Sequence, residues 1–174
     1  AAALLLSCKA EDIIINIQGD EPFIHPSHIN ALAALCKKEH VDVATLYAPV
    51  QELREMRDPG IPKLVCSLSG RVLYFSRSTI PFVRHAEEAQ WLSNASFKKH
   101  IGLYGYRFSA LQALAALPAT ELEKAEMLEQ LRWMEHDISI YAAAVEESGM
   151  SVDTPEDLER AVAFAKEKEP AQKG

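Results

Sequence analysis

Residues 12–18 read Asp-Ile-Ile-Ile-Asn-Ile-Gln, a short and nearly continuous run of β-branched side chains. Such a run predicts a strand buried on both faces, as in a parallel sheet. It ends at the turn sequence Gly19-Asp20-Glu21-Pro22; a helical pattern follows in Pro26–Lys38, and Val41–Val50 has the pattern of a second buried strand. These segments predict a β-α-β unit.

The rest of the chain continues this alternation. Further strand patterns occupy Lys63–Ser67, Val72–Ser76, His100–Phe108 and Ile138–Val145. Further helical patterns occupy Gln51–Met56, Ser109–Leu117, Thr120–Glu135 and Pro155–Lys168. Ser69-Gly70 predicts the turn of an inserted β-hairpin. We therefore expect a single α/β domain over residues 1–174, with a mostly parallel central sheet and a frayed tail at 169–174.

The charge balance limits the partners. Eighteen Lys and Arg against 25 Asp and Glu give a formal net charge of −7, so the positive surface typical of a nucleic-acid binder is absent. No apolar run approaches the roughly 18 residues needed to span a bilayer, and we expect no membrane insertion. The cysteines at positions 8, 36 and 66 are odd in number and widely spaced. This spacing predicts reduced thiols and a cytoplasmic location.

Two carboxylates are candidate metal ligands. Asp20 follows the first predicted strand, and open α/β sheets bind ligands beyond the carboxyl ends of their strands. A second carboxylate from a distant loop, such as Asp153, would complete a pair suited to Mg²⁺. Each also has a structural explanation: Asp20 can cap the turn, and spacing alone favours Asp153 as part of a helix start. Neither GxGxxG nor GxxxxGK occurs, so any phosphate loop would lie elsewhere.

Other polar residues fit a small anionic or hydroxylated ligand. Arg77 lies between a strand and a loop, where a guanidinium can hold a carboxylate in a bidentate pair. His100, Gly102, Tyr104 and Tyr106 share one face of an extended strand, which suits a hydroxyl-rich ligand or a core packed with aromatic rings.

The helix predicted over Thr120–Glu135 has two distinct faces. Its apolar stripe consists of Met127, Leu128, Leu131 and Met134. The opposite face carries Glu126, Glu129, Gln130 and Trp133. This second face fits a polar cleft, a subunit contact or a solvated surface.

Five blocks of the sequence together resemble the 3-deoxy-D-manno-octulosonate (Kdo) cytidylyltransferases. The blocks are Ile15–Pro22, Tyr74–Pro81, His100–Arg107, Glu126–Arg132 and Val152–Arg160. Their order and separations are similar to the family's over residues 12–165. The resemblance implies a Rossmann-like nucleotidyltransferase fold, with the hairpin region used in a homodimer.

The resemblance also implies a reaction and a site. The family transfers CMP from CTP to the anomeric hydroxyl of Kdo, with Mg²⁺, releases pyrophosphate and activates Kdo for lipopolysaccharide biosynthesis. The resemblance assigns Asp20 and Asp153 as metal ligands and places Gln18 near the metal and nucleotide. The residues that it assigns to the Kdo site are Arg77, His100, Tyr104, Glu129 and Gln130. Among these, Arg77 is expected to pair with the carboxylate, and Asp20, Asp153 and Arg77 are the expected catalytic residues.

The chain departs from the family pattern in two places. Ser151 stands where the family usually has Gly before Val-Asp-Thr-Pro. The family's N-terminal segment, with its basic phosphate loop, has no counterpart in the chain, so we expect an N-terminally incomplete domain that binds CTP weakly. Two other functions stay open: a related cytidylyltransferase for a sialic-type acid, and a noncatalytic oligomerisation or regulatory module.

Overall fold

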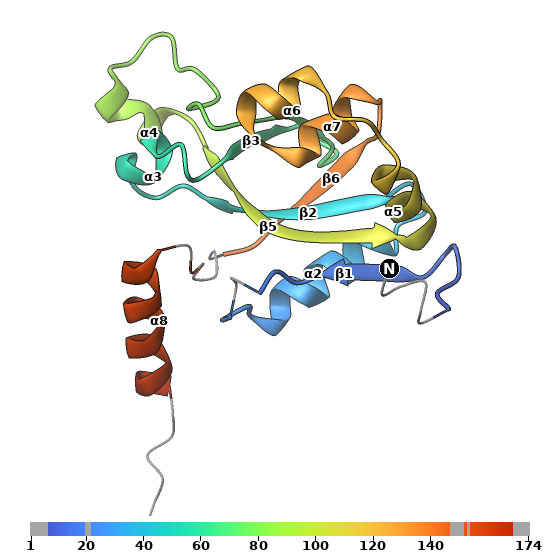
Figure 1. Ribbon diagram of the computed structural model, residues 1–174. Helices are drawn as coiled ribbons and strands as arrows, with labels where there is room; N and C mark the ends of the chain where they lie inside the picture. Colours follow the sequence, from blue (N-terminus) through green and yellow to red (C-terminus); the bar gives the residue numbers. More distant parts are fainter. Residues whose placement is uncertain (1–6, 20–21, 147–151, 153, 169–174) are drawn as a thin grey trace, which may run out of the picture.

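The computed structural model describes residues 7–19, 22–146, 152 and 154–168 (Figure 1). Six strands form one sheet in the order β4-β3-β5-β2-β6, and β1 also pairs with β5. The strands are β1 (Ile13–Asn16), β2 (Val43–Pro49), β3 (Lys63–Cys66), β4 (Val72–Ser76), β5 (Lys98–Arg107) and β6 (Ile140–Ala144). The helices are α2 (Pro26–Cys36), α3 (Leu53–Arg57), η1 (Glu88–Gln90), α4 (Trp91–Asn94), α5 (Phe108–Ala115), α6 (Glu121–Glu126), α7 (Glu129–Glu135) and α8 (Pro155–Lys168). The predicted α/β class is confirmed.

The prediction of a mostly parallel sheet is wrong for the described strands. Their only parallel pairing joins β2 to β6, whereas β5 is antiparallel to β1, β2 and β3, and β3 is antiparallel to β4. The cause is β5, a strand of 10 residues that lies between β1 and β2 and runs opposite to both. β1, β2 and β6 therefore run in the same direction, and their carboxyl ends point to one edge of the sheet.

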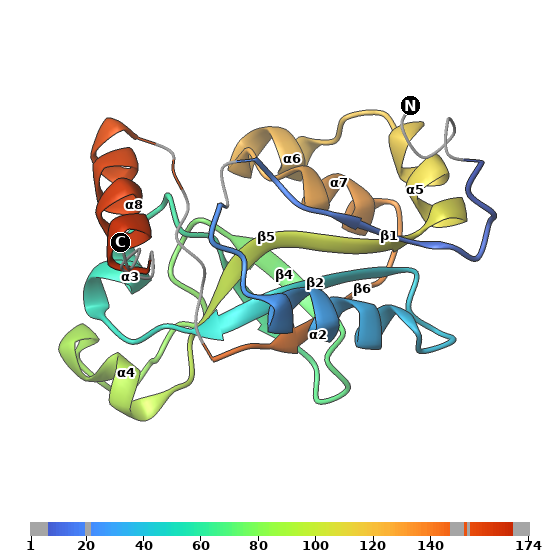
Figure 2. The same cartoon turned by 90° about the horizontal axis from the view of Figure 1, so that it is seen from below.

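The central strand β5 sends alternate side chains to two hydrophobic cores. Ile101 and Leu103 pack with Leu32 and Cys36 of α2 on one face. Tyr104 and Tyr106 pack against the other face with residues of α5 and α7. Figure 2 shows α2 lying over its face of the sheet, with α6 and α7 on the far side.

Helix α2 approaches β5 so closely that position 105 requires a glycine. A Cβ atom on Gly105 would lie 2.7 Å from Sγ of Cys36 and 3.8 Å from Cβ of Leu32. A larger residue there would require the Cys36 side chain or α2 itself to shift.

The predicted hairpin is confirmed as β3 and β4. The strands pair from Lys63 opposite Ser76 to Cys66 opposite Val72, and Gly70 in the turn has a φ of 85°. Glycine tolerates this left-handed conformation without steric cost. Through β3, the hairpin joins the first half of β5 and extends the sheet.

The helix predicted over Thr120–Glu135 is interrupted. It divides into α6 and α7 at Met127, which has a left-handed φ of 51°, and at Leu128, which is extended. The break changes which side chains are buried, because it resets the helical phase. Met127 is 74% exposed, whereas Trp133, predicted on the polar face, is 5% exposed and lies in the core.

No helix in the described residues is long and apolar enough to cross a membrane. All three cysteines are free thiols, and only Cys36 is fully buried. The last helix, α8, has the predicted bounds, and the ring of its Phe164 lies 4.9 Å from the ring of Phe23.

Candidate active site

Four of the predicted site residues lie between β5 and α7. His100 and Tyr104 come from the α7-facing side of β5, and Glu129 and Gln130 form the first turn of α7. We call these four residues the β5–α7 cluster. The rings of His100 and Tyr104 are 5.4 Å apart, and the Trp133 ring lies edge-on at 5.3 Å from Tyr104. The cluster thus combines polar groups with an aromatic wall.

Tyr104 carries a buried hydroxyl that no described residue satisfies. Its Oη has no hydrogen-bond partner among the described residues. Burial raises the pKa of Tyr104 well above its ordinary value, the nearby Tyr106 and Glu129 raise it further, and the Thr45 side chain opposes part of this shift. The phenol is therefore neutral and can donate a hydrogen bond. An unsatisfied buried hydroxyl costs roughly 1–3 kcal/mol, a cost that a bound polar ligand would remove.

His100 is held through one ring nitrogen. Its Nε2 lies 2.9 Å from Oγ1 of Thr45, a fully buried residue of β2. Burial lowers the pKa of His100 to about 3, so the imidazole is neutral near pH 7. A neutral imidazole has one N–H donor and one acceptor nitrogen.

Arg77 lies at the end of β4, where it binds the junction of α6 and α7. Its guanidinium donates to the carbonyl oxygens of Pro59 (2.8 Å), Glu126 (2.7 Å) and Met127 (3.1 Å). Three of its five N–H groups thus donate within the protein. The remaining two are enough in number for a bidentate pair with a carboxylate. The prediction that Arg77 pairs with a substrate carboxylate stays a prediction.

Glu126 completes the same junction from the other side. Its carboxylate accepts hydrogen bonds from Oγ of Ser76 at 2.6 Å and from the backbone N–H of Arg77 at 2.9 Å. In a continuous helix, the carbonyls of residues 126 and 127 would accept bonds from residues 130 and 131. Here they bind Arg77 instead, which explains the break and sets where α7 begins.

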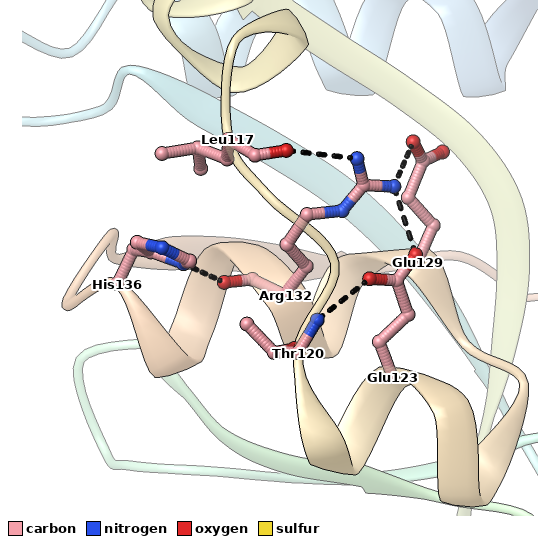
Figure 3. Close-up of polar contacts among 6 residues, drawn as sticks. All are labelled: Leu117, Thr120, Glu123, Glu129, Arg132 and His136. Carbon is pink, nitrogen blue, oxygen red and sulfur yellow. Dashed lines mark hydrogen bonds and ion pairs between the residues drawn. The ribbon is translucent and has the colours of Figure 1, made fainter.

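Glu129 is oriented by a second arginine (Figure 3). Arg132 donates through Nη2 to carboxylate oxygens of Glu123 and Glu129, each at 2.8 Å. The arginine is largely buried, whereas the Glu129 side chain is 64% exposed. The pair therefore contributes little to stability, but it directs the carboxylate at the start of α7.

The remaining predicted residues are only partly described. Gln18 follows β1 and lies beside β5, since a Cβ atom on Gly102 would be 3.6 Å from its Oε1. Asp20, Asp153 and Ser151 lie outside the described residues, so the predicted metal pair has no described geometry. Within the described part of the chain, no group of three or more His, Cys, Asp or Glu side chains could hold a metal ion.

Sequence reasoning missed the residue that supports His100. Thr45 lies between Ala44 and Leu46 in a strand whose only other hydroxyl side chain is Tyr47. A polar residue inside an otherwise buried strand was an available signal, because buried hydroxyls need partners. Its partner could not be inferred, since it lies 55 residues away.

This sheet, with α2 on one face and the polar cluster under α7 on the other, is the architecture of the α/β nucleotidyltransferases. A solved structure of CMP:2-keto-3-deoxy-manno-octonic acid synthetase complexed with CTP superposes with a TM-score of 0.83. It is 37% identical, and the match covers 95% of this chain and 66% of that one. The model of the cytidylyltransferase family matches residues 1–143, and the chain belongs to that family.

Curated relatives agree with this assignment. A 3-deoxy-manno-octulosonate cytidylyltransferase of Parabacteroides distasonis is 42% identical over 157 residues, 88% of this chain and 62% of that protein. The protein of the same name from Acidobacterium capsulatum is 47% identical over 147 residues, 84% of this chain and 58% of that protein. The resemblance found in the sequence is confirmed. The chain spans about three fifths of the length of these relatives.

Proposed function

We propose that the protein carrying this chain transfers CMP from CTP to Kdo, giving CMP-Kdo and pyrophosphate. The observation that carries the proposal is the β5–α7 cluster, with its neutral imidazole, unsatisfied buried hydroxyl, carboxylate and amide. Such a set of donors and acceptors suits a polyhydroxylated acid. The names of the relatives support Kdo as that acid and CTP as the nucleotide.

In this reaction the anomeric hydroxyl oxygen of Kdo bonds to the α-phosphorus of CTP. The bond from that phosphorus to the bridging oxygen breaks, pyrophosphate leaves, and the hydroxyl proton is released. The task of the protein is to orient the two substrates and to balance charge on the phosphates. The β5–α7 cluster and Arg77 are proposed to hold the sugar acid, and Gln18 is proposed to lie near the metal and the nucleotide.

Asp20 and Asp153 are proposed to hold Mg²⁺. Their segments follow β1 and β6, whose carboxyl ends point to the same edge of the sheet. Two carboxylates are a suitable donor set for Mg²⁺, whose other positions go to phosphates and water. When bound, the ion supplies positive charge to the phosphate oxygens. A cytoplasmic location, a homodimer and a role in lipopolysaccharide biosynthesis belong to the same proposal.

The test is turnover with defined sugar acids. The protein is incubated with CTP, Mg²⁺ and Kdo, pyrophosphate and the CMP-sugar are followed, and binding of Kdo is measured separately by calorimetry. Pyrophosphate release that needs both substrates supports the proposal, and release only with a sialic acid supports the related enzyme. Binding of Kdo without turnover would mean that residues 1–174 form the sugar-acid site but do not catalyse the transfer. Absence of both binding and turnover supports a noncatalytic module.

The metal proposal makes its own prediction. In the active protein, Asp20→Asn and Asp153→Asn should each abolish most pyrophosphate release, because an amide removes negative charge from the site but keeps its shape. Circular dichroism should show an unchanged fold. Wild-type turnover that persists in excess chelator would contradict the metal requirement.

A further inference from the structure

The pairing of β2 with β5 is irregular beside His100. Thr45 pairs with Tyr104, but the next residue, Leu46, pairs with Ile101. Two residues of β5, Gly102 and Leu103, are thus extra at this point. An irregularity of this kind disturbs the ladder and leaves local backbone groups in need of other partners.

The Thr45 side chain spans this irregularity. Its Oγ1 lies 3.0 Å from the carbonyl oxygen of Leu103 and 3.2 Å from that of Ile101. A hydroxyl has only one hydrogen, and both carbonyls can only accept. If this hydrogen pointed elsewhere, both carbonyl oxygens would face lone pairs of Oγ1, so we place the hydrogen toward the carbonyls.

This arrangement decides which nitrogen of His100 carries the proton. Because the Thr45 hydrogen is already donated, Oγ1 can only accept from Nε2 at 2.9 Å. The opposite assignment would turn the lone pairs of Oγ1 toward two carbonyl oxygens. This geometry favours the Nε2–H tautomer of His100, in which Nδ1 is an acceptor.

We infer that Thr45 is a positioning residue that fixes His100 as a hydrogen-bond acceptor for a hydroxyl group of the bound sugar acid. This inference rests on the proposed function and adds the direction of one hydrogen bond. An acceptor nitrogen selects a ligand O–H and disfavours a carboxylate oxygen. The ring is supported on two sides, with the Phe75 ring at 5.1 Å and the Tyr104 ring at 5.4 Å.

The first measurement needs neither a substrate nor a variant of Thr45. Nitrogen-15 NMR of the wild-type chain distinguishes protonated from unprotonated ring nitrogens, and a His100→Gln variant assigns the signal among the six histidines. We expect Nε2 protonated and Nδ1 unprotonated near pH 7. A protonated Nδ1 would overturn the inference whether or not the protein acts on Kdo.

The second measurement compares two variants of Thr45. Thr45→Val removes the hydroxyl and keeps the shape, whereas Thr45→Ser keeps the hydroxyl and removes the methyl group. Loss of one neutral hydrogen bond should weaken Kdo binding about two- to tenfold in the Val variant. The Ser variant should retain both the tautomer and the affinity, and CTP binding should change in neither.

Deoxy analogues of Kdo separate positioning from general damage. The analogue that lacks the hydroxyl bound to Nδ1 should bind the wild type more weakly and lose no further affinity in Thr45→Val. Equal losses of Kdo affinity in the Val and Ser variants would overturn the inference. It would also be overturned if the loss from Thr45→Val and the loss from each missing ligand hydroxyl added together for every analogue. If Thr45→Val does not fold, the wild-type tautomer and the Ser variant still decide the question.

Discussion

At the scale of single residues, we expect the titration of His100 to make stability depend on pH. Burial lowers its pKa to about 3, whereas an unfolded histidine has a pKa of about 6.5. The folded state therefore disfavours protonation. Its stability contribution is complete above the unfolded pKa and is lost as pH falls from there toward the folded pKa.

We expect the wild type to lose up to about 1.4 kcal/mol of unfolding free energy per pH unit in this range through His100 alone. Urea unfolding of the wild type and of His100→Gln at pH 7 and pH 4.5 measures this contribution. The variant should lose less stability on acidification, because it lacks the titrating group. If the unfolding free energies of the two proteins changed equally with pH, the pKa of His100 in the folded state would not be lowered.

Arg77 has two roles to separate, as a clamp on three carbonyls and as the proposed partner of the Kdo carboxylate. Arg77→Ala should weaken Kdo binding by about 1.5–3 kcal/mol, the range for a hydrogen bond to a charged group, and should change CTP binding far less. It should also lower thermal stability. The methyl ester of Kdo discriminates between the roles: the wild type should prefer the acid to the ester, and the variant should not. If the Arg77→Ala variant still binds the acid more tightly than the ester, Arg77 does not pair with the carboxylate and has only a structural role.

At the scale of elements, the break between α6 and α7 places one residue, Met127, in a left-handed conformation. Met127 has a φ of 51° and an exposed side chain, so little packing depends on it. A left-handed conformation costs a non-glycine residue about 1–2 kcal/mol, which glycine avoids at some cost in entropy.

Met127→Gly should therefore leave stability within about 1 kcal/mol of the wild type and preserve Kdo binding. Met127→Ile should lower stability by more, because a β-branched residue tolerates this φ poorly. Urea unfolding and calorimetry check both variants. A stabilising Ile variant with higher helix content would mean that the helix becomes continuous without harm.

At the scale of the whole molecule, the proposed sugar-acid site and the phosphate site differ in completeness. The β5–α7 cluster is assembled from described elements, but the 174 residues contain no glycine-rich phosphate loop and carry a net charge of −7. Two carboxylates without cationic partners repel a triphosphate. We expect residues 1–174 to bind CTP with Mg²⁺ weakly. Calorimetry with CTP and Kdo on the same sample measures this, and tight CTP binding would place the phosphate site among residues interpreted as scaffold.

The amino-acid sequence by itself determined the elements with local causes. The β-branched run before Gln18, the hairpin turn at Gly70 and the helix beginning at Pro155 lie where the patterns predict. Hydrophobic period, turn residues and capping act within a few positions, so local sequence carries them. The five blocks of family resemblance likewise identified the family.

Only the tertiary structure decided the relations between distant segments. The direction of β5 reverses the expected strand pairing, and Arg77 binds the carbonyl oxygens of Glu126 and Met127 where local signals predict a continuous helix. The same is true of His100, whose proton position depends on a threonine 55 residues away. These features depend on contacts that exist only once the chain is folded, and each outweighs a local preference of about 1–2 kcal/mol or less.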